Sequence, residues 1–375
     1  MHFWKHFLLI PLALLAALPA AAQKLETVAN FSGAMVTGVT VSHTGRVFVC
    51  YPHWGDNVPF TVAEVKNGQA LAYPNAAVNK LDPHHPAACF YSVQSVVVDP
   101  KDRLWALDTG SVKLGANVPN GPKLVCLDLK TNKITRKIFF SRSVVTPETY
   151  LNDIRFDLKR GVAGTAYITD SGAKSPNGII VVDLATGSSL RRLGGHPSVK
   201  AEPLFTPVVE GQPLLERKPG QTPQHLKLGS DGIAISADGK TLFYCALAGR
   251  HLFGVSTAAL ADKAKTEAEV EATVHDYGIK GASDGMETDA LGRIYVTDYE
   301  HARVLRGQPG GPYEAVAQTA SIYWPDTLSV ATDGYLYFIA NELQRQPNFH
   351  NGKDLRVKPY KLYRVKIDGA PVLLR

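Results

Sequence analysis

Cysteine is scarce in this chain of 375 residues, and its spacing argues against two kinds of site. No two of the four cysteines form a Cys-x-x-Cys motif, so neither a zinc site nor a thiol redox motif is indicated. Four cysteines allow three disulfide pairings, and the sequence does not choose among them. Buried free thiols are the alternative for Cys50 and Cys245, which fall at equivalent points of two repeats. The other two are Cys89 and Cys126.

Other signatures are missing as well. The 40 Lys and Arg residues exceed the 34 Asp and Glu residues, yet no basic block marks a nucleic-acid-binding face. The segments 109–111 and 170–172 lack the Gly-x-Ser-x-Gly elbow of a serine hydrolase, and no phosphate loop or dinucleotide fingerprint occurs. We therefore expect no nucleic-acid partner and neither a nucleotide nor a haem cofactor.

A single apolar run stands out, at the N-terminus. Lys5 precedes a stretch of 12 residues from Phe7 to Leu18, and the small residues 20–22 follow. Such a stretch is too short to span a bilayer and is typical of a signal peptide. We predict a signal peptide at residues 1–22, cleavage near Ala22, and export to the periplasm or the outside. Residues 23–375 are expected to form a single domain without a membrane span.

Six strand–turn–strand units recur along the rest of the chain. Each has a strand, a turn built on Gly or Asp, and a second apolar strand. They occupy residues 37–50, 94–108, 152–170, 230–245, 283–304 and 325–341. About 55 residues for each unit leave room for four strands, the size of one propeller blade. The sequence therefore predicts an all-β protein, a six-bladed β-propeller with four antiparallel strands per blade.

Segments outside the repeats carry further expectations. Residues 26–31 and 371–375 each resemble a single strand, and pairing them within one blade would close the ring. Residues 196–227 contain six prolines, which indicates a long loop, either a surface connection or a lid across the channel mouth. Residues 256–273 lack Gly and Pro, so we expect a short surface helix there.

Polar residues open four of the predicted inner strands. They are Asn152 with Asp153, Asp231, Asp284 and Asp326. Because the inner strands of a propeller run along the channel, these side chains should meet at one mouth. Converging carboxylates would raise at least one pKa, which is typical of acid–base sites. The alternative is that each Asp caps a strand end and bonds to nearby backbone amides.

Seven segments resemble the yellow/major royal jelly protein family, in family order across nearly the whole chain. They are residues 46–54, 103–110, 123–132, 150–153, 166–172, 231–236 and 338–343. Typical of them are Arg103-Leu-Trp-Ala-Leu-Asp-Thr-Gly110 and Ala166-Tyr-Ile-Thr-Asp-Ser-Gly172. The chain is similar to the bacterial members of the family, often labelled dopachrome-tautomerase-related. The resemblance implies a secreted propeller with a small-molecule pocket at one channel mouth, but no single activity.

Two further residues are candidate ligand contacts, the first of them from the same resemblance. Asn341 stands where amine-binding members place a polar contact, although a turn residue is the alternative. Trp324 is placed to stack on an aromatic ligand, although aromatic residues at blade ends are commonly part of the core. Together with Asp153 and Asp326, these residues form the predicted ligand-binding set.

A more distant similarity concerns a metal. The gluconolactonase/regucalcin family, also six-bladed, resembles this chain at Asn152 and Asp284, and Asp231 stands where that family has Asn. The resemblance implies one divalent cation, often calcium, held by Asn152, Asp231 and Asp284. Thr37 and Gly38 stand where that family has a Glu ligand, so one of its ligands is missing here.

Three functions remain open. The first is an isomerase of dopachrome-like aromatic compounds, with Asp284 or Asp231 as the catalytic base. The second is a divalent-metal-dependent lactonase or hydrolase. The third is a binder of small amines or aromatics without turnover. A small-molecule ligand and a monomeric protein are expected in each case.

Overall fold

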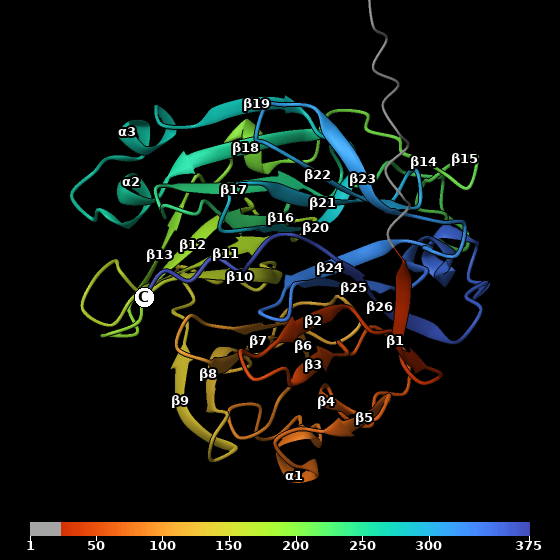
Figure 1. Ribbon diagram of the computed structural model, residues 1–375, viewed down its shortest axis with the longest axis horizontal. Helices are drawn as coiled ribbons and strands as arrows, with labels where there is room; N and C mark the ends of the chain where they lie inside the picture. The colour runs from red at the N-terminus through yellow and green to blue at the C-terminus, as the bar shows by residue number, and fades with distance from the viewer. Residues whose placement is uncertain (1–23) are drawn as a thin grey trace, which may run out of the picture.

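Six four-stranded antiparallel sheets surround a central channel (Figure 1). The computed structural model describes residues 24–375. Blade 1 consists of β2 (Gly38–Val41), β3 (Val47–Cys50), β4 (Val62–Lys66) and β5 (Gln69–Ala72). Blade 2 consists of β6 (Val93–Val98), β7 (Arg103–Thr109), β8 (Pro122–Asp128) and β9 (Lys133–Phe139). Blade 3 consists of β10 (Leu151–Asp157), β11 (Thr165–Asp170), β12 (Gly178–Asp183) and β13 (Ser189–Arg192).

The other three blades follow in chain order. Blade 4 consists of β16 (Ser230–Ile235), β17 (Thr241–Ala246), β18 (His251–Ser256) and β19 (His275–Ile279). Blade 5 consists of β20 (Ser283–Thr288), β21 (Ile294–Asp298), β22 (Arg303–Gly307) and β23 (Tyr313–Gln318). Blade 6 consists of β24 (Pro325–Val330), β25 (Tyr335–Ala340), β26 (Tyr360–Lys366) and β1 (Leu25–Phe31). The inner strands β2, β6, β10, β16, β20 and β24 contact one another in a closed ring. The predicted six-bladed propeller with four antiparallel strands per blade is confirmed.

Burial along the strands follows their position in the blade. The inner strands β2 and β16 are buried along their whole length, whereas the outermost strand β5 alternates between exposed and half-buried residues. An inner strand lies between neighbouring blades and needs small or apolar side chains on both faces. The turn in blade 5 shows how the sequence ends such a strand: Gly292 takes a φ of 78°, and Asp289 accepts hydrogen bonds from two backbone amides of the turn.

The ring closes differently from our prediction. The N-terminal strand β1 is the outer strand of blade 6, as Figure 1 shows, but it pairs with β26, from Leu25 opposite Val365 to Phe31 opposite Tyr360. The predicted pairing of residues 26–31 with 371–375 is wrong. Residues 371–375 cannot pair with β1, because β26 already fills the position beside it.

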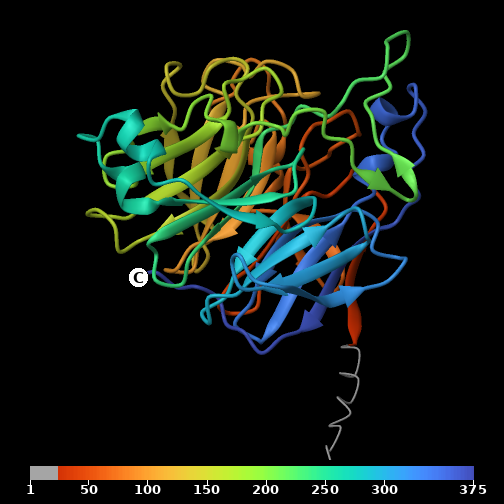
Figure 2. The same ribbon diagram turned by 90° about the horizontal axis from the view of Figure 1, so that it is seen from above.

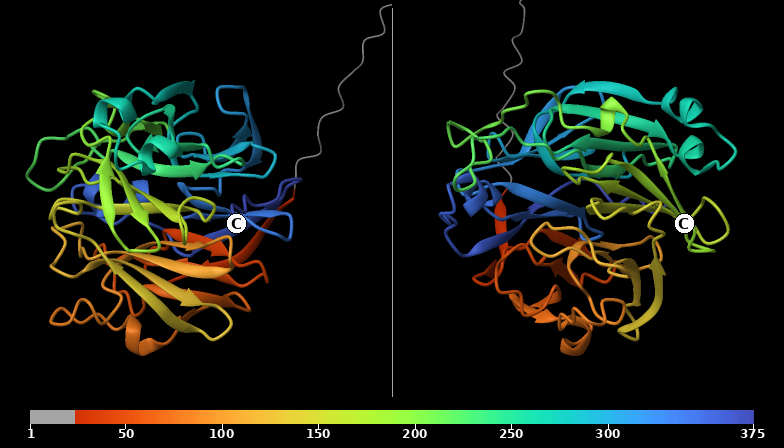
Figure 3. Two further views of the ribbon diagram at one scale, coloured as in Figure 1. Left: turned by 90° about the vertical axis from the view of Figure 1, so that its left-hand side faces the viewer. Right: turned by 180° about the vertical axis from the view of Figure 1, so that it is seen from behind.

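The C-terminal tail instead crosses the far end of the channel. Ala290 donates its backbone N–H to Ala370 at 2.8 Å, and Leu158 donates to Leu374 at 2.9 Å. Leu374 is only 1% exposed and packs in the core between blades 3 and 4. The C-terminus that follows it is marked in both views of Figure 3. A chamber of about 70 Å³ remains between the tail and the inner strands. The tail therefore covers the mouth opposite to the strand starts.

The long loops gather on the other face of the propeller (Figure 2). Residues 196–227 include η1 (Pro197–Val199), β14 (Val208–Val209) and β15 (Gln212–Pro213), and Arg217 exchanges backbone hydrogen bonds with the segment that contains η2 (Leu343–Arg345) and η3 (Pro347–Phe349). Phe205 and Leu226 of this loop share a buried cluster with Trp324. The loop is therefore packed onto the propeller beside the mouth.

The remaining expectations concern helices and cysteines. The surface helix expected at residues 256–273 is two short helices, α2 (Thr257–Ala261) and α3 (Glu267–Glu271), and a third, α1 (Ala76–Asn79), lies in blade 1. All four cysteines are buried and free. No helix in residues 24–375 is long and apolar enough to cross a membrane. The predicted signal peptide lies outside the described residues, so the boundary at residue 23 stays a prediction.

Candidate functional site

The starts of the inner strands bring the predicted polar residues to one mouth of the channel. They surround a small cavity lined by Gln94, Ser95, Asn152, Asp153, Asp231, Gly232, Asp284, Gly285, Asp326 and Thr327. The cavity measures about 10 Å³ for a water-sized sphere, which is room for one water molecule or one ion. The predicted convergence at the mouth therefore holds for the four inner strands that carry these polar residues.

A repeated backbone irregularity aims these side chains. The pairing of the first two strands shifts register at residues 152–153, 231–232, 284–285 and 326–327. A shift of this kind bends the strand and redirects a side chain. In blade 5 the hydroxyl of Thr297 accepts the backbone N–H groups of Asp284 and Gly285, which the shift leaves outside the strand ladder.

Two glycines allow the blades to approach each other at the mouth. A Cβ atom on Gly232 would lie 2.4 Å from the carbonyl oxygen of Asp284, and one on Gly285 would lie 2.4 Å from that of Asp326. Neither backbone can move away, because both belong to packed inner strands. In each Asp-Gly pair the glycine lets the backbones of two neighbouring blades come close together. The carboxyl group of the Asp is thereby brought near the next blade.

Asp284 and Asp231 form the centre of the site. Asp284 is 8% exposed, and its Oδ2 accepts the indole N–H of Trp324 at 2.7 Å. Burial raises the pKa of Asp284 to about 6, although the Trp324 bond lowers it. Asp231 accepts the side-chain amide of Asn152 at 2.7 Å. Burial, followed by the charge of Asp284, raises the pKa of Asp231 well above its usual range.

Asp326 and Asp153 flank this pair and differ in their partners. Asp326 accepts the amide of Asn341 at 2.5 Å, and burial followed by the charge of Asp284 raises its pKa. Asp153 pairs with the guanidinium of Arg155 at 3.0 Å. Among residues 24–375, Arg155 is the only Arg or Lys that lines either the mouth cavity or the opposite chamber. The described mouth therefore carries more carboxyl groups than cations.

The predicted ligand contacts Trp324 and Asn341 lie close to this cluster but point to protein groups. Trp324 is 1% exposed and stacks on Tyr299, with ring centroids 4.1 Å apart and planes 11° apart. Its φ of 47° is unusual for a bulky residue, and such strain occurs at functional sites. Asn341 also donates to the carbonyl oxygen of Val36 at 3.0 Å. Their contact with a ligand stays a prediction.

Two features of the site were missed at the level of sequence. Gln94 and Ser95 line the cavity without carrying a carboxyl group, and only their place at the start of the second repeat could have indicated them. A Gly-x-Ser-x-Gly spacing does occur, at residues 281–285. Its Ser283 is fully buried, donates to the carbonyl oxygen of Gly285 at 3.0 Å and opens a strand, so it is no nucleophile elbow.

The donor groups at the mouth are oxygens, the ligand chemistry that calcium prefers. Among the described residues, however, no three His, Cys, Asp or Glu side chains are grouped so as to hold a metal ion. Blade 1 presents Thr37 and Gly38 here, and neither carries a carboxylate. A cation held by Asn152, Asp231 and Asp284 therefore stays a prediction.

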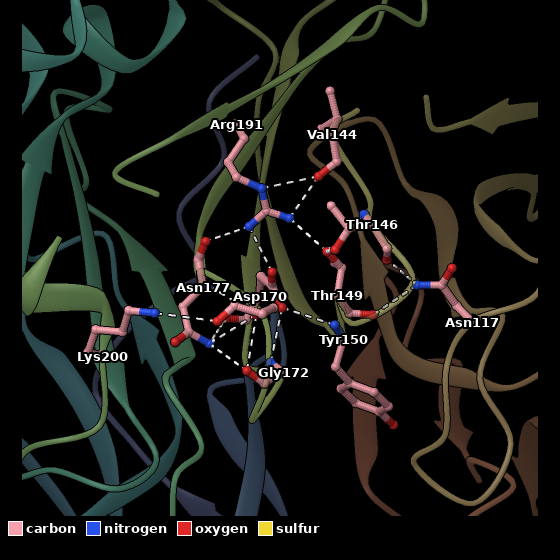
Figure 4. Close-up of polar contacts among 11 residues, drawn as sticks. Asn117, Val144, Thr146, Thr149, Tyr150, Asp170, Gly172, Asn177, Arg191 and Lys200 are labelled. Atoms are coloured by element: carbon pink, nitrogen blue, oxygen red, sulfur yellow. Dashed lines mark hydrogen bonds and ion pairs between the residues drawn. The ribbon is translucent and has the colours of Figure 1, made fainter. Parts of the chain in front are cut away.

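A second set of aspartates stabilises the blades rather than the mouth. Asp170, at the end of β11, accepts the backbone N–H of Tyr150 at 3.0 Å and pairs with Arg191 at 2.7 Å (Figure 4). In blade 2 Asp108 occupies the same place and pairs with the fully buried Lys123 at 2.7 Å. These aspartates hold the chain that leads into an inner strand.

Comparison with known proteins identifies the family. A model of the major royal jelly protein family matches residues 91–366. The chain belongs to this family. It is 27% identical over 266 residues to protein yellow of Drosophila guanche and 28% identical over 254 residues to protein yellow of Drosophila pseudoobscura pseudoobscura. These matches cover 67% and 64% of this chain but 45% and 42% of those proteins, so the chain spans less than half of their length.

Solved structures place this family member among other propellers. A luciferin-regenerating enzyme superposes with a TM-score of 0.57 at 12% identity, covering 94% of this chain and 99% of that one. A gluconolactonase from Xanthomonas campestris gives 0.53 at 12%, with 92% and 91% covered, and a calcium-binding regucalcin from Agrobacterium tumefaciens gives 0.51 at 14%, with 92% and 97% covered. At such identities the likeness shows the fold alone. The predicted bacterial origin stays a prediction.

Proposed function

We propose that this protein isomerises a small aromatic carbonyl compound of the dopachrome type by proton transfer at the channel mouth. One observation carries the proposal: Asp231 and Asp284 lie together in a buried cavity, and their surroundings raise both pKa values. Paired groups whose pKa values are pushed away from the ordinary range are typical of acid–base catalysts.

The two carboxyl groups take opposite roles in the reaction. With a pKa of about 6, Asp284 is ionised at neutral pH and removes a proton from a carbon of the substrate. The electron pair of the broken C–H bond moves through the conjugated ring to the carbonyl oxygen. In this proposal Asp231 supplies the proton for this oxygen, because burial and the charge of Asp284 raise its pKa and so favour its neutral form. One C–H bond breaks and one O–H bond forms, so neither an oxidant nor a reductant is needed.

The size of the cavity limits how such a substrate binds. Its space of about 10 Å³ accepts one polar atom, so the ring would lie above the mouth. The loop of residues 196–227 packs beside this position and would have to yield to the ring. We therefore expect the substrate to be small and planar, with its carbonyl oxygen directed into the cavity.

Loss of dopachrome colour tests the proposal. The purified protein is mixed with dopachrome and the rate is compared with that of buffer alone. Asp284→Asn should lower kcat about 100-fold or more, because it removes the base and keeps the shape of the side chain. Asp238→Asn is the matched control, since Asp238 is an exposed turn residue of blade 4. A wild-type rate equal to that of the buffer contradicts the isomerase, and amine binding detected by calorimetry would then favour a binder without turnover.

A second candidate is a metal-dependent lactonase. The excess of carboxyl groups around a cavity of one-ion size favours it, and a divalent cation held by Asn152, Asp231 and Asp284 would polarise the carbonyl group of a lactone. Calcium should then raise the melting temperature of the wild type, and Asp231→Asn should abolish that rise. An unchanged melting temperature together with no bound metal by elemental analysis contradicts this candidate.

We further propose that the chain is exported after cleavage near Ala22 and acts as a monomer. The apolar N-terminal run and the family membership support export. N-terminal sequencing of the protein recovered outside the cytoplasm should begin near Gln23. Sedimentation of that protein should give the mass of one chain.

A further inference from the structure

Gln94 lines the mouth with an amide whose orientation is set by its neighbours. It opens the inner strand of blade 2 and borders the same cavity as Asp231 and Asp284. Its Oε1 accepts the hydroxyl of Tyr150 at 2.9 Å. Its Nε2 makes no hydrogen bond within residues 24–375, and this atom is not completely shielded from solvent. This nitrogen therefore has two hydrogens to offer to a ligand.

The orientation of the amide follows from a chain of donors. The indole N–H of Trp54 can only donate, and it lies 2.6 Å from the hydroxyl oxygen of Tyr150. That oxygen therefore accepts from Trp54, and the single hydrogen of Tyr150 is left for Gln94. Only Oε1 can accept it. The NH₂ group must then occupy the other position of the amide.

Tyr150 is itself held by the network of Figure 4. Its backbone N–H donates to the carboxylate of Asp170. Arg191 pairs with this carboxylate and also donates to the carbonyl oxygen of Val144 at 2.7 Å and to the hydroxyl of Thr149 at 2.8 Å. The ring of Tyr150 extends from this network, as Figure 4 shows. Its hydroxyl accepts from Trp54 and donates to Gln94. Such a fixed donor chain costs little reorganisation when charge develops on a ligand.

We propose that Gln94 is a catalytic residue that donates its Nε2 hydrogen to the carbonyl oxygen of the substrate, while Trp54 and Tyr150 are positioning residues. This inference rests on the proposed isomerase. As Asp284 takes the carbon proton, negative charge develops on that oxygen, and the bond from Gln94 strengthens until Asp231 delivers the second proton. The substrate class is thereby narrowed to planar compounds whose carbonyl oxygen can reach Gln94 and whose acidic C–H lies on the side of Asp284.

A graded series of variants tests this assignment with dopachrome. Gln94→Met keeps the length of the side chain and removes the donor, so kcat should fall about 100-fold while KM changes less than about threefold. Tyr150→Phe frees the amide to flip, and kcat should fall about tenfold. Tyr244→Phe is the matched control: Tyr244 is also buried, its hydroxyl meets Ser198, and neither residue lines the mouth cavity, so its kcat should equal that of the wild type. Wild-type turnover by Gln94→Met would overturn the proposal.

A second measurement separates this inference from the isomerase itself. Tropolone, a stable planar compound with a carbonyl group, is added to the ¹⁵N-labelled protein, and the side-chain amide signals of Gln94 are assigned by their loss in Gln94→Met. These signals should shift on saturation even if dopachrome is not turned over, in which case the donor stands and the proposed reaction fails. If the shifts of other signals show that the protein is saturated with tropolone while the signals of Gln94 do not shift, the donor role is refuted. Melting curves of each variant check that the fold is kept.

Discussion

Asp284 should cost the protein stability at neutral pH, and its replacement by Asn should return that stability. Below about pH 3 the carboxyl group is protonated in both the folded and the unfolded chain. Its pKa is 3.8 when unfolded and about 6 when folded, because burial disfavours the charged form. Between these values the folded protein binds more protons than the unfolded one, so the free energy of unfolding falls as the pH rises.

The size of this effect follows from the two pKa values. The difference corresponds to about 3 kcal/mol, which is lost from the free energy of unfolding by about pH 7. Asn cannot ionise, and its side-chain oxygen can still accept the indole N–H of Trp324. For a chain of this length, about 3 kcal/mol raises the melting temperature by about 4 °C. Asp231 and Asp326, whose pKa values are also raised by burial, contribute with the same sign.

Urea unfolding of the wild type and Asp284→Asn at pH 4, 5, 6 and 7 measures the effect. The variant should gain stability over the wild type progressively across this range, with little difference at pH 4. Asp238→Asn controls for the loss of a carboxyl group in general, since Asp238 lies exposed in a turn. A stability difference that is independent of pH would refute the reasoning, because the burial of an ionised carboxylate would then not be its cause.

Two further predictions concern the framework of the propeller. Leu374→Ala should lower the free energy of unfolding by about 3 kcal/mol in urea titrations, because Leu374 is buried in the core between blades 3 and 4; Leu291→Ala, at an exposed position, should change it little. Lys123→Met should lower it by about 4 kcal/mol, because Asp108 is left buried and charged without its partner, and Asp108→Asn in the same chain should recover part of the loss. Unchanged melting curves would contradict either account.

Much of the fold follows from local sequence. Alternating apolar residues and Gly or Asp turns, as at Asp289 to Gly292, specify a strand–turn–strand unit within a few residues of each other. Six copies of the unit then require a radial arrangement, because a single sheet cannot cover both of its faces. The partner of the N-terminal strand could not be predicted in this way, since residues 360–366 and 371–375 both lie more than 300 residues away along the chain and only packing decides between them.

The candidate site, like the fold, was predictable from the sequence only in part. The repeat alone indicates which residues open the inner strands, and hence that Asp231, Asp284 and Asp326 share one mouth, because strand order and direction are properties of the repeat. The partner of each carboxyl group depends on how the blades pack: the indole of Trp324 at Asp284, the amide of Asn341 at Asp326, and the oriented amide of Gln94 nearby. These contacts join blades that lie far apart along the chain, and their chemistry depends on distances of a few ångströms that no local pattern encodes.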